Sequence, residues 1–241
     1  MRNSRVVLAV GAHPDDIDFG AAGTIAKWTG EGARVYYLVC TDGSRGSDDP
    51  GMTRKKLAQI RREEQVNAGR VLGIKKIFFL KHADTTLVSD FKLKKDIAQV
   101  IKTIKPNILL TMDPSLYYSE KFSFINHSDH RAAALAAMDA CFPLSRDRLT
   151  FPDHERKGLF PHKTKELWLI GFEKRNQLVD VTKTFEKKLK ALSMHKSQFP
   201  DFPAVKKKVE ETARYFGEGL PAGKQAKGVK YAENFTRIVI S

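Results

Sequence analysis

The stretch RVVLAVGAHPDD, residues 5–16, decides the fold and locates the chemistry. Residues 5–11 form a short apolar run that ends at glycine, which is typical of a β-strand buried on both faces of a sheet. A histidine and two adjacent carboxylates follow directly. In an open parallel sheet, ligands bind beyond the carboxyl ends of the strands. We therefore expect His13, Asp15 and Asp16 to face a ligand crevice; the alternative is that an aspartate only caps the next helix.

Strand and helix patterns alternate along the rest of the chain. This alternation predicts an α/β fold, a Rossmann-like three-layer sandwich with a mostly parallel sheet. We expect one domain, residues 1–241, in which about 200–241 form a cap or an extra edge strand. The further strands are expected at 34–40, 76–80, 107–112 and 166–171, with an edge strand at 177–180, and the helices at 17–28, 53–72, 92–104, 130–141 and 179–195.

The charge balance of 42 basic against 28 acidic residues, +14 in total, favours anionic partners. The favoured explanation of the excess is nevertheless a solvated basic surface without a partner. The lysine runs lack interleaved aromatic residues and a glycine-rich phosphate loop, so no nucleic-acid partner is expected. No apolar run approaches about eighteen residues, and no secretory signal pattern is present, so we expect neither a membrane span nor secretion. Cys40 and Cys141 are expected as buried free thiols, which favours the cytoplasm.

A second polar motif, Asn126-His127-Ser128-Asp129-His130, follows the fourth predicted strand. Two histidines three residues apart suit metal binding at the start of a helix. Both motifs follow parallel strands, so they should meet at one rim of the sheet. Hydrolytic zinc sites use three ligands from His, Asp and Glu and leave one position for water. Two histidines and a carboxylate meet that need, and the remaining groups can move protons, so the pattern predicts a metal-dependent hydrolase.

These motifs resemble the LmbE/PIG-L family of zinc-dependent N-deacetylases, which act mainly on N-acetylglucosaminyl compounds. The similarity runs from about Val6 to His130, with weaker traces as far as Gln198. Its core consists of His13-Pro14-Asp15-Asp16, Gly20, Gly23-Thr24, Thr41-Asp42-Gly43, Arg61 through Glu64, Leu72-Gly73, Asp84 and His127-x-x-His130.

The resemblance implies roles for eight residues. It implies that His13, Asp16 and His130 are the ligands of a zinc ion; the sequence leaves Fe²⁺ or Co²⁺ open in place of zinc. It implies Asp15 as the general base, His127 as an oxyanion stabiliser or acid, and Asp129 as the residue that tunes or orients His127. Arg61 and Asp84 match positions that contact the sugar. For Arg61 the alternative is a charge on the helix surface, paired with Glu63 or Glu64.

The chain departs from the family pattern at three positions. Ser128 stands where many members have proline, Asp18 where glutamate is usual, and Ile125 where some have a tyrosine that polarises the substrate carbonyl. Tyr117 or Tyr118 can replace that tyrosine, although packing is the simpler interpretation.

Two groups of residues outside the motifs receive simpler interpretations. Ser44-Arg45-Gly46-Ser47 lies in a loop that we expect to be surface-exposed and mobile, where it binds an anionic substrate group or serves as a lid. Surface or packing roles are expected for the remaining histidines, His82, His154, His162 and His195.

The function expected from the sequence is removal of an N-acetyl (acyl) group from an amino-sugar conjugate such as an N-acetylglucosaminyl compound. The partner is then a small-molecule substrate, and a homo-oligomer is compatible with this function. Two alternatives stay open: an amidase that acts on another acyl or thiol conjugate, and a basic module for nucleic acid or an anionic surface with a vestigial metal site. A phosphoesterase is disfavoured because two-metal sites need more bridging carboxylates.

Overall fold

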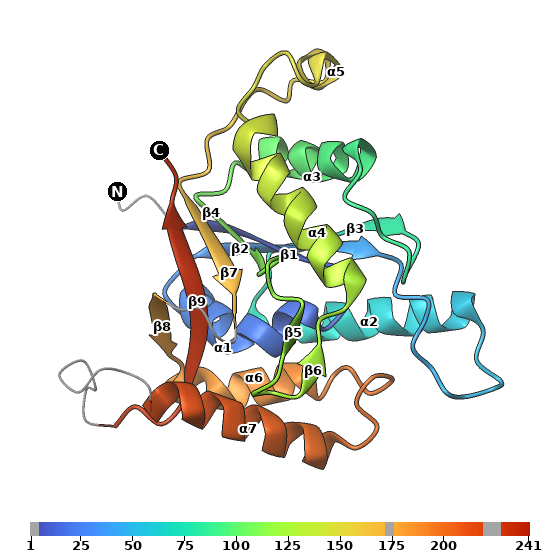
Figure 1. Ribbon diagram of the computed structural model, residues 1–241, viewed down its shortest axis with the longest axis vertical. Coiled ribbons are helices and arrows are strands. Elements are labelled where there is room, and N and C mark those ends of the chain that lie inside the picture. The colour runs from blue at the N-terminus through green and yellow to red at the C-terminus, as the bar shows by residue number, and fades with distance from the viewer. Residues whose placement is uncertain (1–4, 172–175, 219–227) are drawn as a thin grey trace.

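A seven-stranded sheet forms the centre of the computed structural model, which describes residues 5–171, 176–218 and 228–241. The strand order is β3-β2-β1-β4-β7-β9-β8, and the first five strands run parallel (Figure 1). β9 pairs antiparallel with both of its neighbours. The predicted mostly parallel sheet is therefore confirmed. The strands are β1 (Val6–Gly11), β2 (Arg34–Thr41), β3 (Lys76–His82), β4 (Ile108–Met112), β7 (Glu166–Ile170), β8 (Gln177–Asp180) and β9 (Ala232–Val239).

Helices cover both faces of the sheet and complete the predicted three layers. Figure 1 shows α3 and α4 on one face and α1, α2, α6 and α7 on the other. The helices are α1 (Asp16–Gly30), α2 (Arg54–Leu72), α3 (Phe91–Ile104), α4 (Ser128–Asp139), α5 (Pro152–Arg156), α6 (Phe185–Leu192) and α7 (Phe202–Glu218), with the short turns η1 (Ala140–Leu144) and η2 (Thr182–Thr184). Among these described helices, none has the length and apolarity needed to cross a bilayer.

The central strand β1 explains why its sequence is apolar throughout. All six of its residues are buried. Val7 and Ala9 belong to the hydrophobic cluster beneath α1, whereas Leu8 and Val10 belong to the cluster beneath α3 and α4. A strand with helices on both faces has no solvent side, so alternation with polar residues is lost.

The C-terminal part of the chain differs from the expected secondary structure. The helix expected at 179–195 is wrong in its first third, because residues 177–180 form β8 and α6 begins only at Phe185. For about 200–241 we expected a cap over the site or an extra edge strand; the described part of this region forms a helix (α7) and a strand (β9), and residues 219–227 lie outside the described residues. That strand is not at the edge, because β9 lies between β7 and β8, and β8 forms the edge.

The long segment after β4 is not wholly irregular. It contains a small antiparallel hairpin of β5 (Tyr118–Ser119) and β6 (Phe124–Ile125). Tyr117 and Tyr118 are 63% and 60% exposed, so the packing role considered for them is wrong.

Candidate active site

The structure brings together all eight residues that the sequence singled out. His13, Asp15 and Asp16 follow β1, Asp84 follows β3, and Arg61 comes from α2. His127, Asp129 and His130 lie at the start of α4, so both motifs meet at the carboxyl ends of the parallel strands, where open α/β sheets bind ligands.

Asp16 connects the two motifs. Its Oδ1 atom lies 3.0 Å from Nε2 of His130, and its Oδ2 atom lies 3.7 Å from Nδ1 of His13. Oδ2 also accepts the backbone N–H groups of Ala12 and His13, each at 2.8 Å. These two bonds fix the carboxylate between the histidines.

Asn126 determines which nitrogen of His130 faces Asp16. The Asn126 Nδ2 group donates to the carbonyl oxygen of Leu116 at 2.8 Å, which leaves its Oδ1 atom 3.0 Å from Nδ1 of His130. Because an amide oxygen only accepts, Nδ1 of His130 carries a hydrogen, and Nε2 of the neutral ring presents a lone pair to Asp16. A lone pair that faces a carboxylate oxygen needs a cation or a proton between them. This donor set therefore fits a divalent metal ion, with Asn126 orienting the histidine from behind.

The surroundings of His13 also favour a cation. Its Nε2 atom lies 3.1 Å from Asp84 and 3.2 Å from Asp129, on the side of the ring away from Asp16. Burial alone would lower the pKa of His13, but Asp16, Asp129 and Asp84 together raise it to about 12. A buried position with this excess of carboxylates is stabilised by positive charge.

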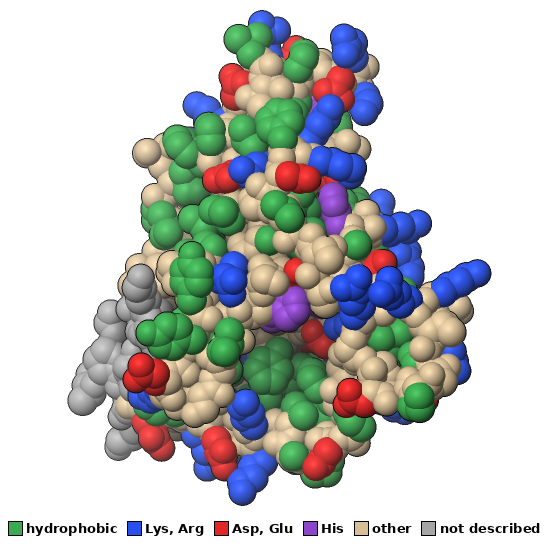
Figure 2. Space-filling view, turned by 45° about the vertical axis from the view of Figure 1, so that its right-hand side comes forward, with side chains coloured by type: hydrophobic (Ala, Val, Ile, Leu, Met, Phe, Trp, Pro, Cys, Tyr) green, Lys and Arg blue, Asp and Glu red, His purple; other side chains and the backbone are tan. Residues whose placement is uncertain are grey.

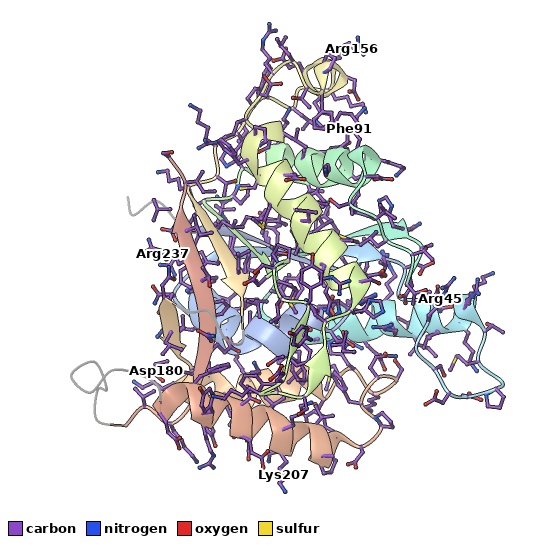
Figure 3. The ribbon with its side chains drawn as sticks, in the orientation of Figure 1. Arg45, Phe91, Arg156, Asp180, Lys207 and Arg237 are labelled. Carbon is purple, nitrogen blue, oxygen red and sulfur yellow. The ribbon has the colours of Figure 1, made fainter. Side chains whose placement is uncertain are left out.

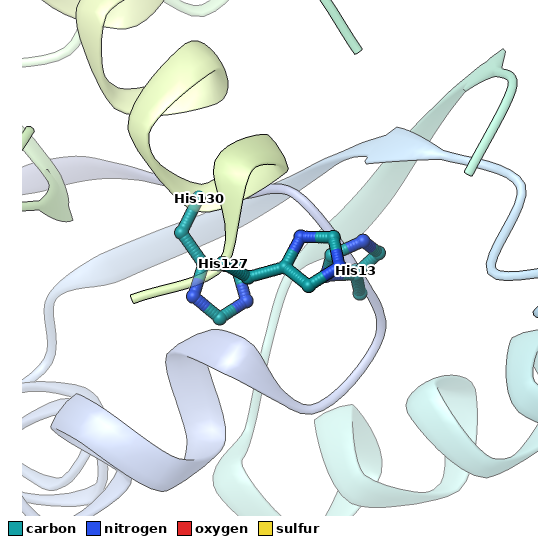
Figure 4. Close-up of side chains that lie close together, drawn as sticks. All are labelled: His13, His127 and His130. Atoms are coloured by element: carbon teal, nitrogen blue, oxygen red, sulfur yellow. The ribbon is translucent and has the colours of Figure 1, made fainter. Parts of the chain in front are cut away.

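Two groups of possible donor atoms meet at His13. Among the residues described, donor atoms of His13, His127 and His130 lie within 4.8 Å of one another (Figure 4), and so do those of His13, Asp84 and Asp129. The first group contains both histidines of the ligand set expected from the sequence.

Asp15 has an unusual backbone conformation, with φ 90° and ψ −31°. Residues with a Cβ atom rarely adopt a positive φ, and such strain is often found at functional sites. The Asp15 carboxylate lies 3.5 Å from Nη2 of Arg61. Burial raises the pKa of Asp15 to about 6, against the opposing charge of Arg61 and with a further contribution from Asp16. A carboxylate with this proton affinity suits a general base near neutral pH.

His127 is placed to donate a hydrogen bond. Its Nδ1 atom accepts the backbone N–H of Asp129 at 3.1 Å, so the neutral ring carries its hydrogen on Nε2. Burial lowers the pKa of His127, and the neighbouring His13 and His130 lower it further. The half-buried ring is thus a neutral donor, as an oxyanion stabiliser requires.

Asp129 contacts the two histidines in different ways. Its backbone N–H holds His127, whereas its carboxylate is directed to His13 and accepts the N–H groups of Thr85 at 2.7 Å and Leu87 at 3.2 Å. The nearest carboxylate oxygen is 4.0 Å from Nδ1 of His127.

Arg61 is not a surface charge, so the alternative considered for it is wrong. The residue is only 5% exposed, and its guanidinium donates to the carbonyl oxygens of Pro14 and Arg45, each at 3.0 Å. It also lies 3.7 Å from Asp84. Arg61 faces inward because its side of α2 packs against the rim, where it fixes the loops that carry Asp15 and Asp84.

A buried polar network behind Asp15 was not predicted. Gln65 accepts the Asp15 N–H at 2.9 Å and donates to Asp18 at 2.8 Å. Asp18 also accepts the hydroxyl of Tyr37 and pairs with Nε2 of His195, each at 2.8 Å. His195 is wholly buried in this ion pair, so a surface or simple packing role is wrong for it. Gln65 lies four residues after Arg61, a spacing that indicates the same helix face, but no local signal pointed to His195.

The other histidines lie outside this network. His82 pairs with Asp96 at 3.0 Å, His162 contacts the carbonyl oxygen of Pro106 at 2.7 Å, and His154 is buried against Phe151.

A cavity of about 210 Å³ opens beside His127 and His130. Figure 2 shows a hollow beneath a histidine at the surface, with hydrophobic side chains at its base. Lys208 and Thr212 of α7, which lies in the region where a C-terminal cap or edge strand was expected, contribute to its walls. The remaining walls come from Phe19, Met112, Phe122, Phe124, Ile125 and Asn126.

Comparison with known proteins identifies the family. Residues 8–141, more than half of the chain, match the family model described as PIG-L, GlcNAc-PI de-N-acetylase. The diacetylchitobiose deacetylase of Thermococcus kodakarensis is 33% identical over 93% of this chain and 82% of its own. A probable N-acetyl-alpha-D-glucosaminyl L-malate deacetylase 2 of Bacillus anthracis is 30% identical, with 91% and 90% covered.

A solved structure agrees with both the fold and the family. The N,N'-diacetylchitobiose deacetylase of Pyrococcus horikoshii, solved with its inhibitor MPG, superposes with a TM-score of 0.88 and 32% identity. The match covers 99% of this chain and 85% of that one. Because the family model, the relatives and the solved structure all agree, the chain belongs to the PIG-L family of de-N-acetylases.

Proposed function

We propose that this protein removes the N-acetyl group from an N-acetylglucosamine conjugate. The observation that carries the proposal is the placement of Asp15, His127 and the Asp16–His130 pair on one rim, beside an apolar cavity. Membership of the PIG-L family supports it, and so do relatives named as deacetylases of diacetylchitobiose and of an N-acetylglucosaminyl malate.

We infer that His13, Asp16 and His130 hold a divalent cation, for which zinc is the first candidate. A tetrahedral site of two histidines and one carboxylate suits zinc and leaves a position for substrate or water. When bound, the ion would supply Lewis acidity that polarises the amide carbonyl and acidifies water.

The remaining catalytic roles are assigned to side chains of the protein. Asp15 accepts a proton from the attacking water, because its carboxylate is buried and basic. The Nε2–H of His127 donates to the amide oxygen as negative charge develops there, and loss of such a donor costs about 10²–10³ in rate. Asp129 holds His13 and His127 in place, and we assign Arg61 and Asp84 to the sugar hydroxyls.

The two cysteines agree with a reducing compartment such as the cytoplasm. Cys40 and Cys141 are both free and buried, and burial raises the pKa of Cys141 to about 11. They are therefore poor nucleophiles, and we assign them to packing.

The experiment compares wild type with Asp15→Asn on acylated glucosamine compounds. The panel contains N-acetylglucosamine, diacetylchitobiose, N-acetylglucosaminyl malate and a longer-acyl analogue, with amine release as the readout and metal per chain measured in parallel. Asp48→Asn, in the exposed loop after β2, is the matched control. Amine release that is lost in Asp15→Asn alone, with metal retained, supports the proposal.

Other outcomes redirect or reject it. Release only from the longer-acyl analogue would point to a different acyl group. If zinc binds but no compound is hydrolysed, amino-sugar deacetylation is wrong. If no metal binds, the assignment of His13, Asp16 and His130 is wrong.

A further inference from the structure

A second cavity, of about 180 Å³, lies on the α2 side of the rim. The loop after β2, the first turns of α2 and the segment after β3 form its walls, with three cationic side chains, Arg45, Arg54 and Lys55. Asp42 and Ala58 are shared with a neighbouring cavity of about 320 Å³, whose walls add Arg62 and Lys81.

Cationic side chains outnumber carboxylates in the walls of the smaller cavity, three against the two of Asp42 and Asp84. Arg54, Lys55, Arg62 and Lys81 form no ion pair with any residue in the described part of the chain, although Arg62 stacks 4.0 Å from the ring of Phe79. Arg45 donates a hydrogen bond to the Thr85 hydroxyl.

Each of the two carboxylates in the same walls accepts backbone N–H groups. Asp42 accepts the backbone N–H groups of Ser44 at 3.0 Å and of Asp84 at 3.4 Å. Asp84 accepts the N–H of Arg45 at 3.0 Å and contacts His13 at 3.1 Å. Asp84 pairs with His13 and Arg61, and within the described residues neither carboxylate forms an ion pair with the side chain of Arg45, Arg54 or Lys55. These cations therefore remain available to an anionic ligand, which arginine and lysine bind through charge-assisted hydrogen bonds.

The cavity is joined to the candidate active site by shared residues. Asp84 lies in its wall and also faces His13, and the carbonyl oxygen of Arg45 accepts from Arg61 at 3.0 Å. Figure 3 shows Arg45 beside α2, and Figure 2 shows Lys and Arg side chains gathered next to the histidine and the hollow. A sugar bound at the rim beside Asp84 would thus have a substituent close to these cations.

We propose that the cavity of Arg45, Arg54 and Lys55 binds an anionic group, a phosphate or a carboxylate, carried by the amino-sugar substrate. This inference rests on the proposed function and narrows the substrate class from N-acetylglucosamine conjugates in general to those that carry an anionic group. The apolar cavity beside His127 has one lysine in its walls, Lys208, and is the weaker candidate for the same group.

The test is a substrate comparison with the double variant Arg54→Ala/Lys55→Ala. The substrates are N-acetylglucosamine, its 1-phosphate, its 6-phosphate and N-acetylglucosaminyl malate. Comparing the phosphates with the malate conjugate distinguishes a phosphate from a carboxylate ligand. Comparing the two phosphates shows which position on the sugar carries the anionic group. The matched control is Lys187→Ala/Lys190→Ala, which removes the same charge from exposed positions on α6 outside both cavities. Metal content and thermal unfolding are measured for each protein to establish that it is folded.

We expect wild type to have a kcat/KM at least about tenfold higher for one anionic substrate than for N-acetylglucosamine, and the double variant to lose this preference. The loss should be roughly tenfold for each ionic hydrogen bond removed, mainly in KM, with activity on the neutral sugar changed about twofold or less. The preference of wild type should also weaken as salt is raised. Equal losses on neutral and anionic substrates, or no preference in wild type, would overturn the inference.

A binding measurement separates this inference from the proposed function. Calorimetry with N-acetylglucosamine 6-phosphate, the 1-phosphate and the malate conjugate is repeated on both variants. If no substrate is hydrolysed but an anionic one binds and the Arg54/Lys55 variant loses that binding, deacetylation is wrong and the anion site stands. Binding that is unchanged in that variant, or absent in wild type, counts against the anion site whether or not the protein is active.

Discussion

Gln65 accepts the backbone N–H of Asp15 at 2.9 Å, and this bond holds the proposed base in a conformation with φ 90°. The same side chain donates to the buried Asp18 at 2.8 Å, so α2, the turn after β1 and α1 are fixed at one point. The backbone of Asp15 is therefore held by a side chain whose hydrogen bonds, within the described residues, go to Asp15 and Asp18 and not to the proposed metal ligands.

Replacing Gln65 should reduce turnover without removing metal. In Gln65→Leu the N–H of Asp15 loses its partner, and a positive φ costs an aspartate about 1–2 kcal/mol. We expect kcat to fall about 10- to 100-fold while KM changes little, measured by steady-state amine release with metal content as the second readout. Gln99→Leu, at an exposed position on α3, is the control. Loss of metal in parallel with kcat would show that Gln65 supports the ligands instead of the base.

Asn126 should govern metal affinity. Its Oδ1 atom fixes Nδ1 of His130 at 3.0 Å, and removal of such an orienting partner typically weakens metal binding about 10- to 100-fold. We expect Asn126→Leu to lose zinc to a chelator at a correspondingly lower chelator concentration than wild type. Asn67→Leu, at an exposed position on α2, should behave like wild type. Unchanged zinc retention in Asn126→Leu would contradict a ligand role for His130.

The buried pair of His195 and Asp18 predicts a pH-dependent stability. Burial alone would lower the pKa of His195, but the hydrogen bond and charge of Asp18 raise it above its ordinary value. The folded protein therefore binds this proton more tightly than the unfolded chain, whose histidine titrates near pH ~6.5. The stabilisation is full below that pH and is lost as the pH rises through the raised pKa.

We expect the free energy of unfolding of wild type to exceed that of His195→Gln most at about pH 6, and the difference to shrink towards about pH 9. Urea unfolding of both proteins across this range measures it. His162 is expected to behave in the opposite way. Burial lowers its pKa, so the stability that its neutral form contributes to the folded protein is lost as the pH falls. If the difference in the free energy of unfolding between wild type and His195→Gln stays constant with pH, His195 and Asp18 do not form a charged pair.

Lys188 and Glu233 attach β9 to α1. The Lys188 ammonium lies 2.6 Å from Glu233 and 2.7 Å from the carbonyl oxygen of Phe19, and Glu233 also accepts the N–H groups of Gly23 and Thr24. Lys188→Met leaves a buried carboxylate without its counter-ion, which typically costs about 3–5 kcal/mol. Thermal or urea unfolding should show this loss, whereas Lys190→Met, exposed on the same helix, should change stability by less than about 0.5 kcal/mol. Equal effects of the two substitutions would mean that the pair contributes little.

The parallel part of the fold could be predicted because its signals are local. Each buried strand is a continuous apolar run of a few residues, and α2 begins at the capping Thr53 and ends at Gly73, which has φ 77°. The two motifs around His13 and His130 could be assigned to one rim for the same reason, since the carboxyl ends of parallel strands share an edge. The roles of individual residues at that rim remain predictions for the experiments above.

The sequence by itself determined the parallel part of the sheet, the rim and the residues gathered there. Only the tertiary structure decided that β9 inserts between β7 and β8, that Arg61 faces inward, and that His195 pairs with Asp18, 177 residues away. Periodicity along the chain reports which side of an element is apolar, but not which distant element it meets. A buried charge becomes stable only when its partner arrives, so its place is set by the completed packing rather than by its neighbours in sequence.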